Sequence, residues 1–348
     1  MPSAAEYLVA LIGAEGGSLR FDRFMHEALY GPSGFYGSGG RAGRRGDFIT
    51  SPEVGPLFGA VLARALDAWW IDAGQPEDFH VYEVGAGPGT LARSVLAAAP
   101  DCLAGNRSRY ACVEVAARQR ESHPDGVTSL ERLPDGELRG VVVANELLDN
   151  LAFRLLVFDG AWREAHVAVR GGSFEEVLRP LEETPPFTLP DRVRLGARVP
   201  WQQAAGEWVA DVTSRLRGRL VLFDYAVAHT AELAVRPWRE WLRTFVSHER
   251  GAHYLRDVGR QDITSDVCVD QLTVRCGEPD AVRTQAQWLQ RWGIDELVAE
   301  GRRVWEAEAA RPSVAAVRMR SRVSESEALL DPAGLGGFNV LEWVKVRG

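Results

Sequence analysis

The chain has 348 residues, of which 46% are apolar and 25% are charged, a composition typical of folded globular proteins. Since a domain has about 150 residues, this length predicts two domains or one domain with insertions. No apolar run is long enough for a membrane helix, and the N-terminus lacks the basic and apolar regions of a signal peptide. The net charge of −8 argues against nucleic acid as the partner. We therefore expect a cytoplasmic enzyme that binds neither nucleic acid nor membrane.

The four cysteines form no C-x-x-C pair, and none has a histidine at the spacing of zinc ligands. They are Cys102, Cys112, Cys268 and Cys276. Such isolated thiols are typical of a reducing compartment, and we expect no metal site.

Residues 1–75 are predicted to be mostly helical around one glycine-rich loop. Apolar residues recur at helical spacing before residue 30, and a second helix is predicted over Leu57–Ala73. Between them, residues 31–46 include seven glycines and one proline, which excludes regular helix and strand. We interpret this part as an N-terminal helical segment whose loop covers a cofactor.

Residues 76–348 alternate between short apolar strands and helical segments. The predicted strands cover residues 80–84, 109–113, 141–144, 219–223 and 338–346. The predicted helices cover residues 90–99, 202–215, 288–310 and 314–330. We interpret the stretches at about 152–217 and 228–275 as insertions, the first with a hairpin around Asp159-Gly160 and then a proline-rich loop. The alternation predicts an α/β fold with a doubly wound parallel sheet.

The most informative segment is a predicted strand, glycine loop and helix between Val81 and Leu91. Its pattern is E-x-G-x-G-x-G, with Glu83, Gly85, Gly87 and Gly89 at the fixed positions. Glycine lets a ligand approach the backbone, and the following helix presents free N–H groups to a nucleotide-like ligand. The third glycine of the dinucleotide fingerprint would fall at position 90, which is threonine, so a nicotinamide cofactor is disfavoured.

Polar residues also follow the next two predicted strands. Glu114 ends one strand, where a carboxylate can accept hydrogen bonds from both hydroxyls of a ribose. The strand after it ends in Asn145-Glu146-Leu147-Leu148-Asp149. Polar groups directly after an apolar strand are typical of a ligand site rather than of a core.

These motifs resemble the MidA family of class I S-adenosylmethionine-dependent methyltransferases, which includes the mitochondrial complex I assembly-factor protein arginine methyltransferase. The similar blocks extend over nearly the whole chain, at residues 24–30, 34–36, 46–53, 57–59, 82–91, 114–119, 145–149, 224–225, 242–243, 248, 262–264 and 334–341. The resemblance implies a Rossmann-like sheet, S-adenosylmethionine as cofactor and an arginine nitrogen of a protein as methyl acceptor. It implies cofactor contacts from Glu83, Gly85, Gly87, Gly89, Glu114, Asn145 and Thr50.

The chain departs from the family pattern at three places near the expected acceptor side. The family's Ala-Leu-Pro is Asn150-Leu151-Ala152 here, its D-Y-G is Asp224-Tyr225-Ala226, and Glu249 replaces a glutamine. These departures leave open another acceptor, such as a small molecule. A non-catalytic assembly or binding protein that keeps the fold is a separate alternative. The intact glycine motif and Glu114 argue against the non-catalytic alternative.

Methyl transfer from a sulfonium is an in-line displacement, so the protein must mainly align donor and acceptor. A guanidinium acceptor needs carboxylates that hold it and accept its proton. The candidates are Asp47, Glu53, Glu146 and Asp149. We expect the loop 46–53 to fold over the cofactor and complete the acceptor pocket. His248 and His253 are alternative bases for a hydroxyl or amine acceptor.

The sequence also leaves open whether the protein forms a homodimer.

Overall fold

The computed structural model describes residues 2–38, 50–246 and 249–345, and its internal contacts divide the chain into two compact units. The parallel-sheet unit comprises Ile49–Glu146, Arg215–Asp224 and Pro279–Gly348. The antiparallel-sheet unit comprises Met1–Phe48, Leu147–Ser214 and Tyr225–Glu278. The division into residues 1–75 and 76–348, with its two insertions, stays a prediction.

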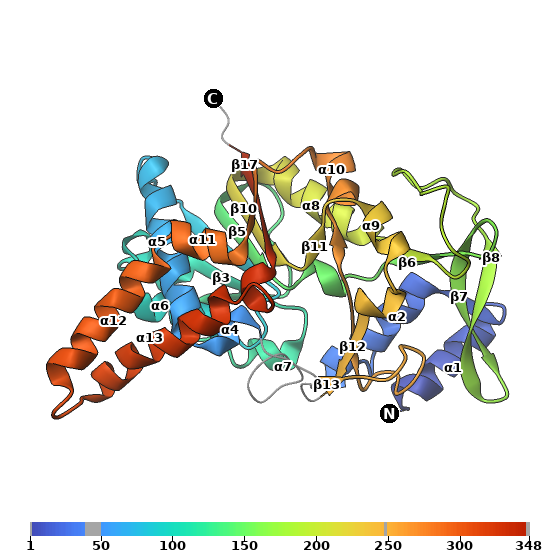
Figure 1. The fold of residues 1–348 in the computed structure, drawn as a ribbon, viewed down its shortest axis with the longest axis horizontal. Helices are drawn as coiled ribbons and strands as arrows, with labels where there is room; N and C mark the ends of the chain where they lie inside the picture. The colour runs from blue at the N-terminus through green and yellow to red at the C-terminus, as the bar shows by residue number, and fades with distance from the viewer. Residues whose placement is uncertain (1, 39–49, 247–248, 346–348) are drawn as a thin grey trace. The chain divides into compact units, whose positions relative to one another are not determined.

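Seven strands form the sheet of the parallel-sheet unit (Figure 1). Their order is β16 (Ala281–Thr284), β17 (Asn339–Lys345), β10 (Leu216–Asp224), β5 (Leu138–Asn145), β2 (His80–Val84), β3 (Tyr110–Val113) and β4 (Thr128–Leu130). The five strands from β10 to β4 are parallel to one another, whereas β17 is antiparallel to both of its neighbours, β16 and β10. This confirms the predicted parallel α/β sheet. Chain order runs outward from β2 through β3 to β4 in one direction and from β5 to β10 in the other.

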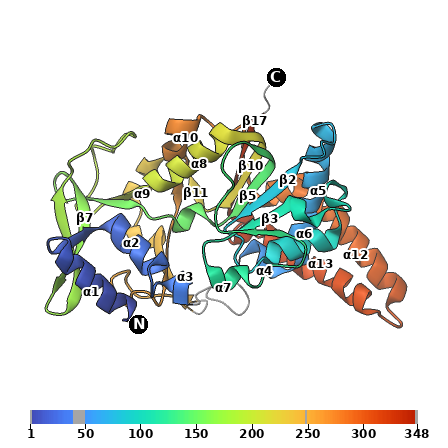
Figure 2. The same ribbon diagram turned by 180° about the vertical axis from the view of Figure 1, so that it is seen from behind.

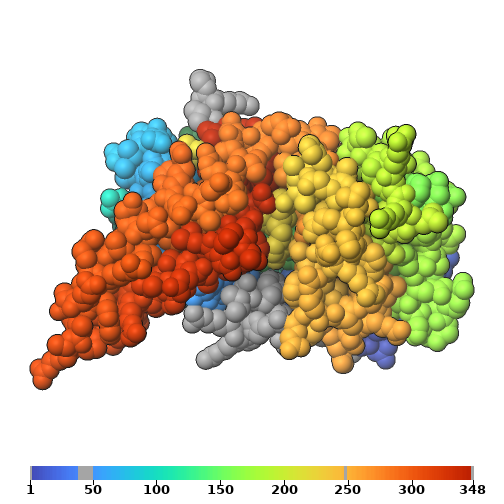
Figure 3. Space-filling view, in the orientation of Figure 1, coloured from blue at the N-terminus to red at the C-terminus, as the bar shows by residue number. Residues whose placement is uncertain are grey.

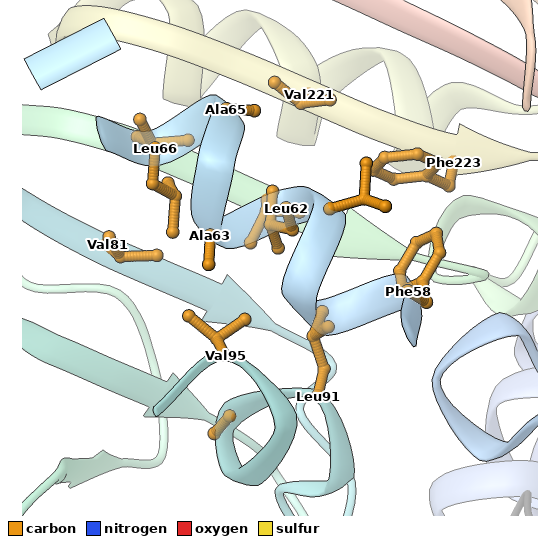
Figure 4. Packing of buried hydrophobic residues seen from close by; sticks show 14 of the residues in the cluster. Phe58, Leu62, Ala63, Ala65, Leu66, Val81, Leu91, Val95, Val221 and Phe223 are labelled. Atoms are coloured by element: carbon orange, nitrogen blue, oxygen red, sulfur yellow. The ribbon is translucent and has the colours of Figure 1, made fainter. Parts of the chain in front are cut away.

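Helices α5 (Pro56–Asp72), α6 (Thr90–Ala98) and α11 (Gln285–Arg291) bury apolar side chains against one face of this sheet (Figures 1, 2 and 4). Figure 4 shows Leu62 of α5 and Val95 of α6 among the buried strand residues. Gly59 allows α5 to approach α6, because a Cβ there would lie 2.4 Å from Ser94 Cβ. Val142 and Leu220, which point to the opposite face, are also buried, so both faces are covered as predicted for such a sheet.

The C-terminal helices α12 (Ile294–Glu308) and α13 (Val314–Leu330) form a hairpin (Figure 3). The prediction of one continuous helix over 288–310 is wrong, because the structure has two helices there, α11 and α12, with a break between them. Gly293 adopts φ +87° at the break and caps α12, a conformation that glycine tolerates without strain.

The antiparallel-sheet unit contains a five-stranded sheet that packs on two N-terminal helices. Its strands run in the order β1 (Ser18–Arg20), β7 (Trp162–Arg170), β6 (Arg154–Phe158) and β9 (Arg198–Trp201), and β8 (Ser173–Pro180) pairs with β7. The helices are α1 (Ala4–Ala14) and α2 (Phe21–Tyr30), whose apolar faces join the core of this unit. The predicted hairpin around Asp159-Gly160 is confirmed by the antiparallel pairing of β6 with β7. Strand β8 was missed, because it is largely solvent-accessible and shows no strong apolar alternation.

The same unit holds several short elements. They are α3 (Phe35–Ser38), α8 (Gln203–Arg215), α9 (Thr230–Val235), α10 (Val269–Cys276), and the strands β11 (Ala226–Val227), β12 (Leu242–Val246), β13 (Glu249–Arg250), β14 (Asp262–Ser265) and β15 (Val267–Cys268). Helix α3 corrects the expectation that residues 31–46 lack helix, since one helical turn forms over Phe35–Ser38 and includes Gly37. Across residues 2–38, 50–246 and 249–345, no helix combines the length and apolar character that crossing a membrane requires.

Candidate active site

Three of the predicted cofactor residues meet at one edge of the parallel sheet. Val84 at the end of β2 pairs with Ala144 of β5 and with Val113 of β3. Gly85, Asn145 and Glu114 directly follow these paired residues, so they stand side by side at the carboxyl ends of the strands. This is also the point where the chain order reverses, and ligands of open α/β sheets bind there.

The glycine loop adopts a backbone that other residues rarely adopt. Gly85, Gly87 and Gly89 have φ values of +72°, +53° and +80°. A Cβ at Gly89 would also lie 2.9 Å from Pro124 Cδ. Gly89 caps the N-terminus of α6, so the first N–H groups of that helix are directed to the loop side. The loop is therefore a backbone surface suited to close approach by a ligand.

Glu114 holds this loop with its carboxylate. Oε2 accepts a hydrogen bond from the Gly87 N–H at 3.0 Å, and Oε1 accepts one from the Ala116 N–H at 2.8 Å. Burial raises the pKa of Glu114, and these two hydrogen bonds oppose the rise. Because each carboxylate oxygen has a second lone pair, Glu114 can hold the loop and still accept hydrogen bonds from ribose hydroxyls.

His123 holds the carbonyl group of the same residue, Gly87, a role that the sequence did not reveal. Its Nε2 lies 3.0 Å from the Gly87 carbonyl oxygen, and its Nδ1 lies 2.8 Å from Ser129 Oγ. A carbonyl oxygen only accepts, so Nε2 carries the proton and Nδ1 accepts from the Ser129 hydroxyl. Arg93 of α6 donates to the Ser122 carbonyl at 2.9 Å and ties the same segment to the loop helix.

Glu83 is buried beneath the loop. Its carboxylate accepts a hydrogen bond from the Tyr110 hydroxyl at 2.7 Å. Burial raises the pKa of Glu83 to about 8, so this side chain is protonated over much of the neutral range. The geometry gives Glu83 a supporting role between β2 and β3, and its direct contact with a cofactor stays a prediction.

Asn145 and Glu146 mark the end of β5. The Asn145 Nδ2 donates to Glu146 Oε1 at 3.1 Å, whereas Asn145 Oδ1 is buried and has no hydrogen-bond partner within the described residues. Glu146 has φ +52°, an uncommon value for a residue with a side chain. An orphaned buried acceptor next to a strained residue is typical of a functional site. The hydroxyl and amino donors of S-adenosylmethionine fit this acceptor, so the residues present suit the implied cofactor.

The N-terminal block reaches the described structure only in part. Asp47 lies outside the described residues. Thr50 is buried before the short helix α4 (Ser51–Val54), which contains the half-buried Glu53. The Ser51 hydroxyl donates to Gln285 Oε1 of α11 at 2.8 Å, so α4 is fixed within the parallel-sheet unit. The catalytic role of Glu53 and the cofactor contact of Thr50 stay predictions.

Asp149 belongs to the antiparallel-sheet unit, in the short turn η3 (Leu148–Asn150). It is buried and accepts a hydrogen bond from the Thr264 hydroxyl of β14 at 2.6 Å. The neighbouring Asn150 donates through Nδ2 to Asp262 Oδ1 and Oδ2 at 3.1 and 3.2 Å. The Tyr36 hydroxyl lies 3.1 Å from Asp262 Oδ1.

Burial raises the pKa of both Asp149 and Asp262, and their mutual repulsion raises that of Asp262 further. The sequence identified Asp149, but it did not reveal that Asp262 and Tyr36 share its network. Two of the other candidates, Glu53 and Glu146, lie in the parallel-sheet unit.

The alternative bases have different surroundings. His253 packs against the rings of Trp238 and Tyr254, with centroid distances of 5.4 and 4.1 Å. Burial lowers its pKa, and nearby arginines lower it further. His248 lies outside the described residues. In the part of the chain that the structure describes, no three His, Cys, Asp or Glu side chains are arranged to hold a metal ion.

Known proteins are similar to this chain in sequence and in fold. The family described as "Putative S-adenosyl-L-methionine-dependent methyltransferase" matches residues 61–286. A Burkholderia thailandensis protein, described as a candidate methyl transferase and solved with bound S-adenosyl-homocysteine, aligns with a TM-score of 0.83 and 28% identity. That alignment covers 99% of this chain and 92% of the other.

Among curated relatives, the mitochondrial protein arginine methyltransferase NDUFAF7 homolog of Drosophila melanogaster is 30% identical over 185 residues, 44% of this chain and 42% of its own length. The human protein arginine methyltransferase NDUFAF7 is 36% identical over 81 residues, 23% of this chain and 18% of its own length. The chain therefore spans less than half the length of these relatives. The family match covers well over half of the chain, and the protein belongs to this family of S-adenosyl-L-methionine-dependent methyltransferases.

Proposed function

We propose that the protein binds S-adenosylmethionine at the carboxyl edge of its parallel sheet and transfers the methyl group to an arginine of a protein. The observation that carries the first part is the hydrogen bond between Glu114 and the Gly87 amide, which fixes the glycine loop for a nucleoside. In this proposal Gly85, Gly87 and Gly89 face the cofactor, Glu114 accepts its ribose hydroxyls, and the orphaned oxygen of Asn145 accepts a further donor.

When bound, the cofactor supplies a methyl group on a positively charged sulfur. The residues of this chain then have to align the acceptor nitrogen and receive the proton that it loses on methylation. Glu146 stands directly after Asn145 and carries a carboxylate at the edge where the cofactor is proposed to bind. We propose Glu146 as a proton acceptor, with Asp47, Glu53 and Asp149 as further candidates.

Two observations support an arginine of a protein as the methyl acceptor. The curated relatives are named as protein arginine methyltransferases, although this chain spans only part of their length. A carboxylate such as that of Glu146 also suits a cationic acceptor, since a guanidinium binds a carboxylate through two parallel hydrogen bonds.

A labelling experiment tests the acceptor. Purified protein is incubated with methyl-labelled S-adenosylmethionine and a lysate of its source, and labelled products are separated by size before acid hydrolysis. Label in methylarginine of a protein supports the proposal, and label only in small molecules overturns the acceptor. If the wild-type protein binds the cofactor but transfers no more label than a Glu114→Ala variant, a non-catalytic assembly protein would be favoured.

We also propose that the protein is cytoplasmic and acts on its partner as a monomer or homodimer. The four cysteines, of which three are buried, are all free, as a reducing compartment allows. Fractionation of the source cells and light scattering of the purified protein test these two statements.

A further inference from the structure

A cavity lies at the amino ends of the parallel strands, the opposite edge of the sheet from the glycine loop. It has a volume of about 280 Å³ and belongs entirely to the parallel-sheet unit. Its wall is made by the start of β5 and β10, the end of β17 and the last turn of α5. Since β2, β5 and β10 are parallel, the cofactor edge and this cavity lie at opposite ends of the same strands.

The inside of the cavity is apolar. Trp69 and Phe79 are each only 3% exposed and contribute aromatic surface, and Val141 and Val344 contribute aliphatic surface. Gly140 pairs with Gly218 across β5 and β10, and a Cβ at Gly218 would lie 1.8 Å from the Gly140 oxygen. Because the two backbones lie so close, neither position can hold a side chain, and backbone atoms alone form this part of the cavity wall.

The rim of the cavity is positively charged, although the whole chain carries a net charge of −8. Four cations line it, and two of them are neutralised: Arg139 pairs with Asp78 and Glu137, and Arg217 also pairs with Glu137.

The other two cations are Arg219 and Lys345. Neither makes an ion pair within the described residues. The Arg219 guanidinium instead lies over the Trp69 ring, 5.4 Å from its centroid. Asp72 is the one remaining lining acid, and it is exposed on the last turn of α5. The rim therefore offers two cations to one acid.

We propose that this cavity is a second binding site, for a small carboxylate with an aromatic or branched apolar body. The body packs against Trp69 and Phe79, and the carboxylate meets Arg219 and Lys345. A carboxylate fits better than a neutral ligand because a cation held against an apolar wall is partly desolvated and gains from a counter-charge. The site does not depend on the proposed methyl transfer.

Binding of phenylacetate, its neutral isostere phenylacetamide and the cation phenethylamine tests the proposal on the full-length protein. Saturation-transfer difference NMR gives the dissociation constants. We expect phenylacetate to bind at least about three-fold more tightly than the amide, the size of an exposed or half-exposed ion pair. We expect phenethylamine to bind more weakly than either.

Variants locate the binding. Ala73→Phe places a ring at the cavity mouth on the exposed end of α5 and should abolish phenylacetate binding. Arg219→Gln and Lys345→Gln should each remove the preference for the acid over the amide. Arg132→Gln, an equal charge change at an exposed site outside the cavity, should leave it unchanged. Thermal unfolding shows that each variant is folded.

The proposal is overturned if acid and amide bind equally, if no probe binds at millimolar concentration, or if folded Ala73→Phe binds phenylacetate like the wild type. The proposal is also overturned if Arg132→Gln removes the preference for the acid to the same extent as Arg219→Gln, because the preference would then reflect overall charge.

Discussion

The Glu114 carboxylate accepts a hydrogen bond from the Gly87 amide at 3.0 Å, so the acid after β3 fixes the loop after β2. The Gly87 N–H donates to Glu114 and the Gly87 carbonyl oxygen accepts from His123, so the peptide groups on both sides of the Gly87 Cα are held. The glycine loop is therefore formed before any ligand arrives, which lowers the entropic cost of binding. The two side chains that hold the loop can be tested separately.

Replacing Glu114 should weaken cofactor binding more than its charge alone explains. In Glu114→Gln, the amide group cannot accept from both the Gly87 and Ala116 N–H groups, so one of them loses its partner. Hydrogen bonds to charged groups contribute about 1.5–3 kcal/mol, so S-adenosylhomocysteine affinity should fall by about ten-fold or more. Titration calorimetry measures it, and Glu131→Gln is the control, because Glu131 is an exposed acid nearby. Equal affinities in the two variants would refute the role of Glu114.

His123 should matter for its donor rather than for its size. His123→Ala removes the hydrogen bond to the Gly87 carbonyl, and a neutral hydrogen bond contributes about 1 kcal/mol, which is about five-fold in affinity. In His123→Gln the side-chain amide can still donate, so most of the affinity should return. The dissociation constant of S-adenosylhomocysteine should change while kcat at saturating cofactor stays close to wild type. If His123→Ala and His123→Gln lose the same affinity for S-adenosylhomocysteine, the imidazole acts only by packing.

Burial of Glu83 should make the protein less stable as pH rises. Its pKa is raised to about 8 in the folded state, above an ordinary value of 4.5, so the folded state binds the proton more tightly. Its contribution is therefore full below about pH 4.5 and is lost as pH rises to about 8, by up to about 1.4 kcal/mol per pH unit. Glu83→Gln has no such proton and should lose less stability over that range. Urea unfolding of both proteins at pH 6 and pH 8 measures the difference, and parallel curves would contradict it.

Asn150 is one of the places where the chain departs from the family pattern, and it should stabilise the buried Asp262. Asn150→Ala restores the family residue but removes the amide that donates to both Asp262 oxygens. The loss should be about 2 kcal/mol in the free energy of unfolding. In Asp262→Asn, which has no charge to stabilise, the same change should cost less. Urea unfolding of the four proteins in this cycle gives the coupling, and strictly additive changes would show that Asn150 and Asp262 act independently.

Much of the parallel-sheet unit follows from local sequence. Apolar runs such as Val141–Ala144 predict buried parallel strands, and the three glycines mark a backbone with positive φ. Because strand order places Gly85, Glu114 and Asn145 at one edge, their proximity could be predicted from positions that directly follow apolar runs.

The remaining site residues depend on contacts that local sequence does not encode. Tyr36 and Asp262 are 226 positions apart, and His123 reaches Gly87 across 36 positions. Glu83 stands at a motif position, yet burial in the folded protein raises its pKa, and burial depends on tertiary packing. Chemistry at the ends of strands could thus be predicted, whereas long-range partners could not.

Calorimetric titration of the purified chain with S-adenosylhomocysteine, and in parallel with NADH, tests the central claim most directly. The proposed cofactor site predicts one equivalent of S-adenosylhomocysteine bound in the micromolar range and no heat from NADH. Binding of NADH, or no binding of S-adenosylhomocysteine by the folded protein, would contradict it.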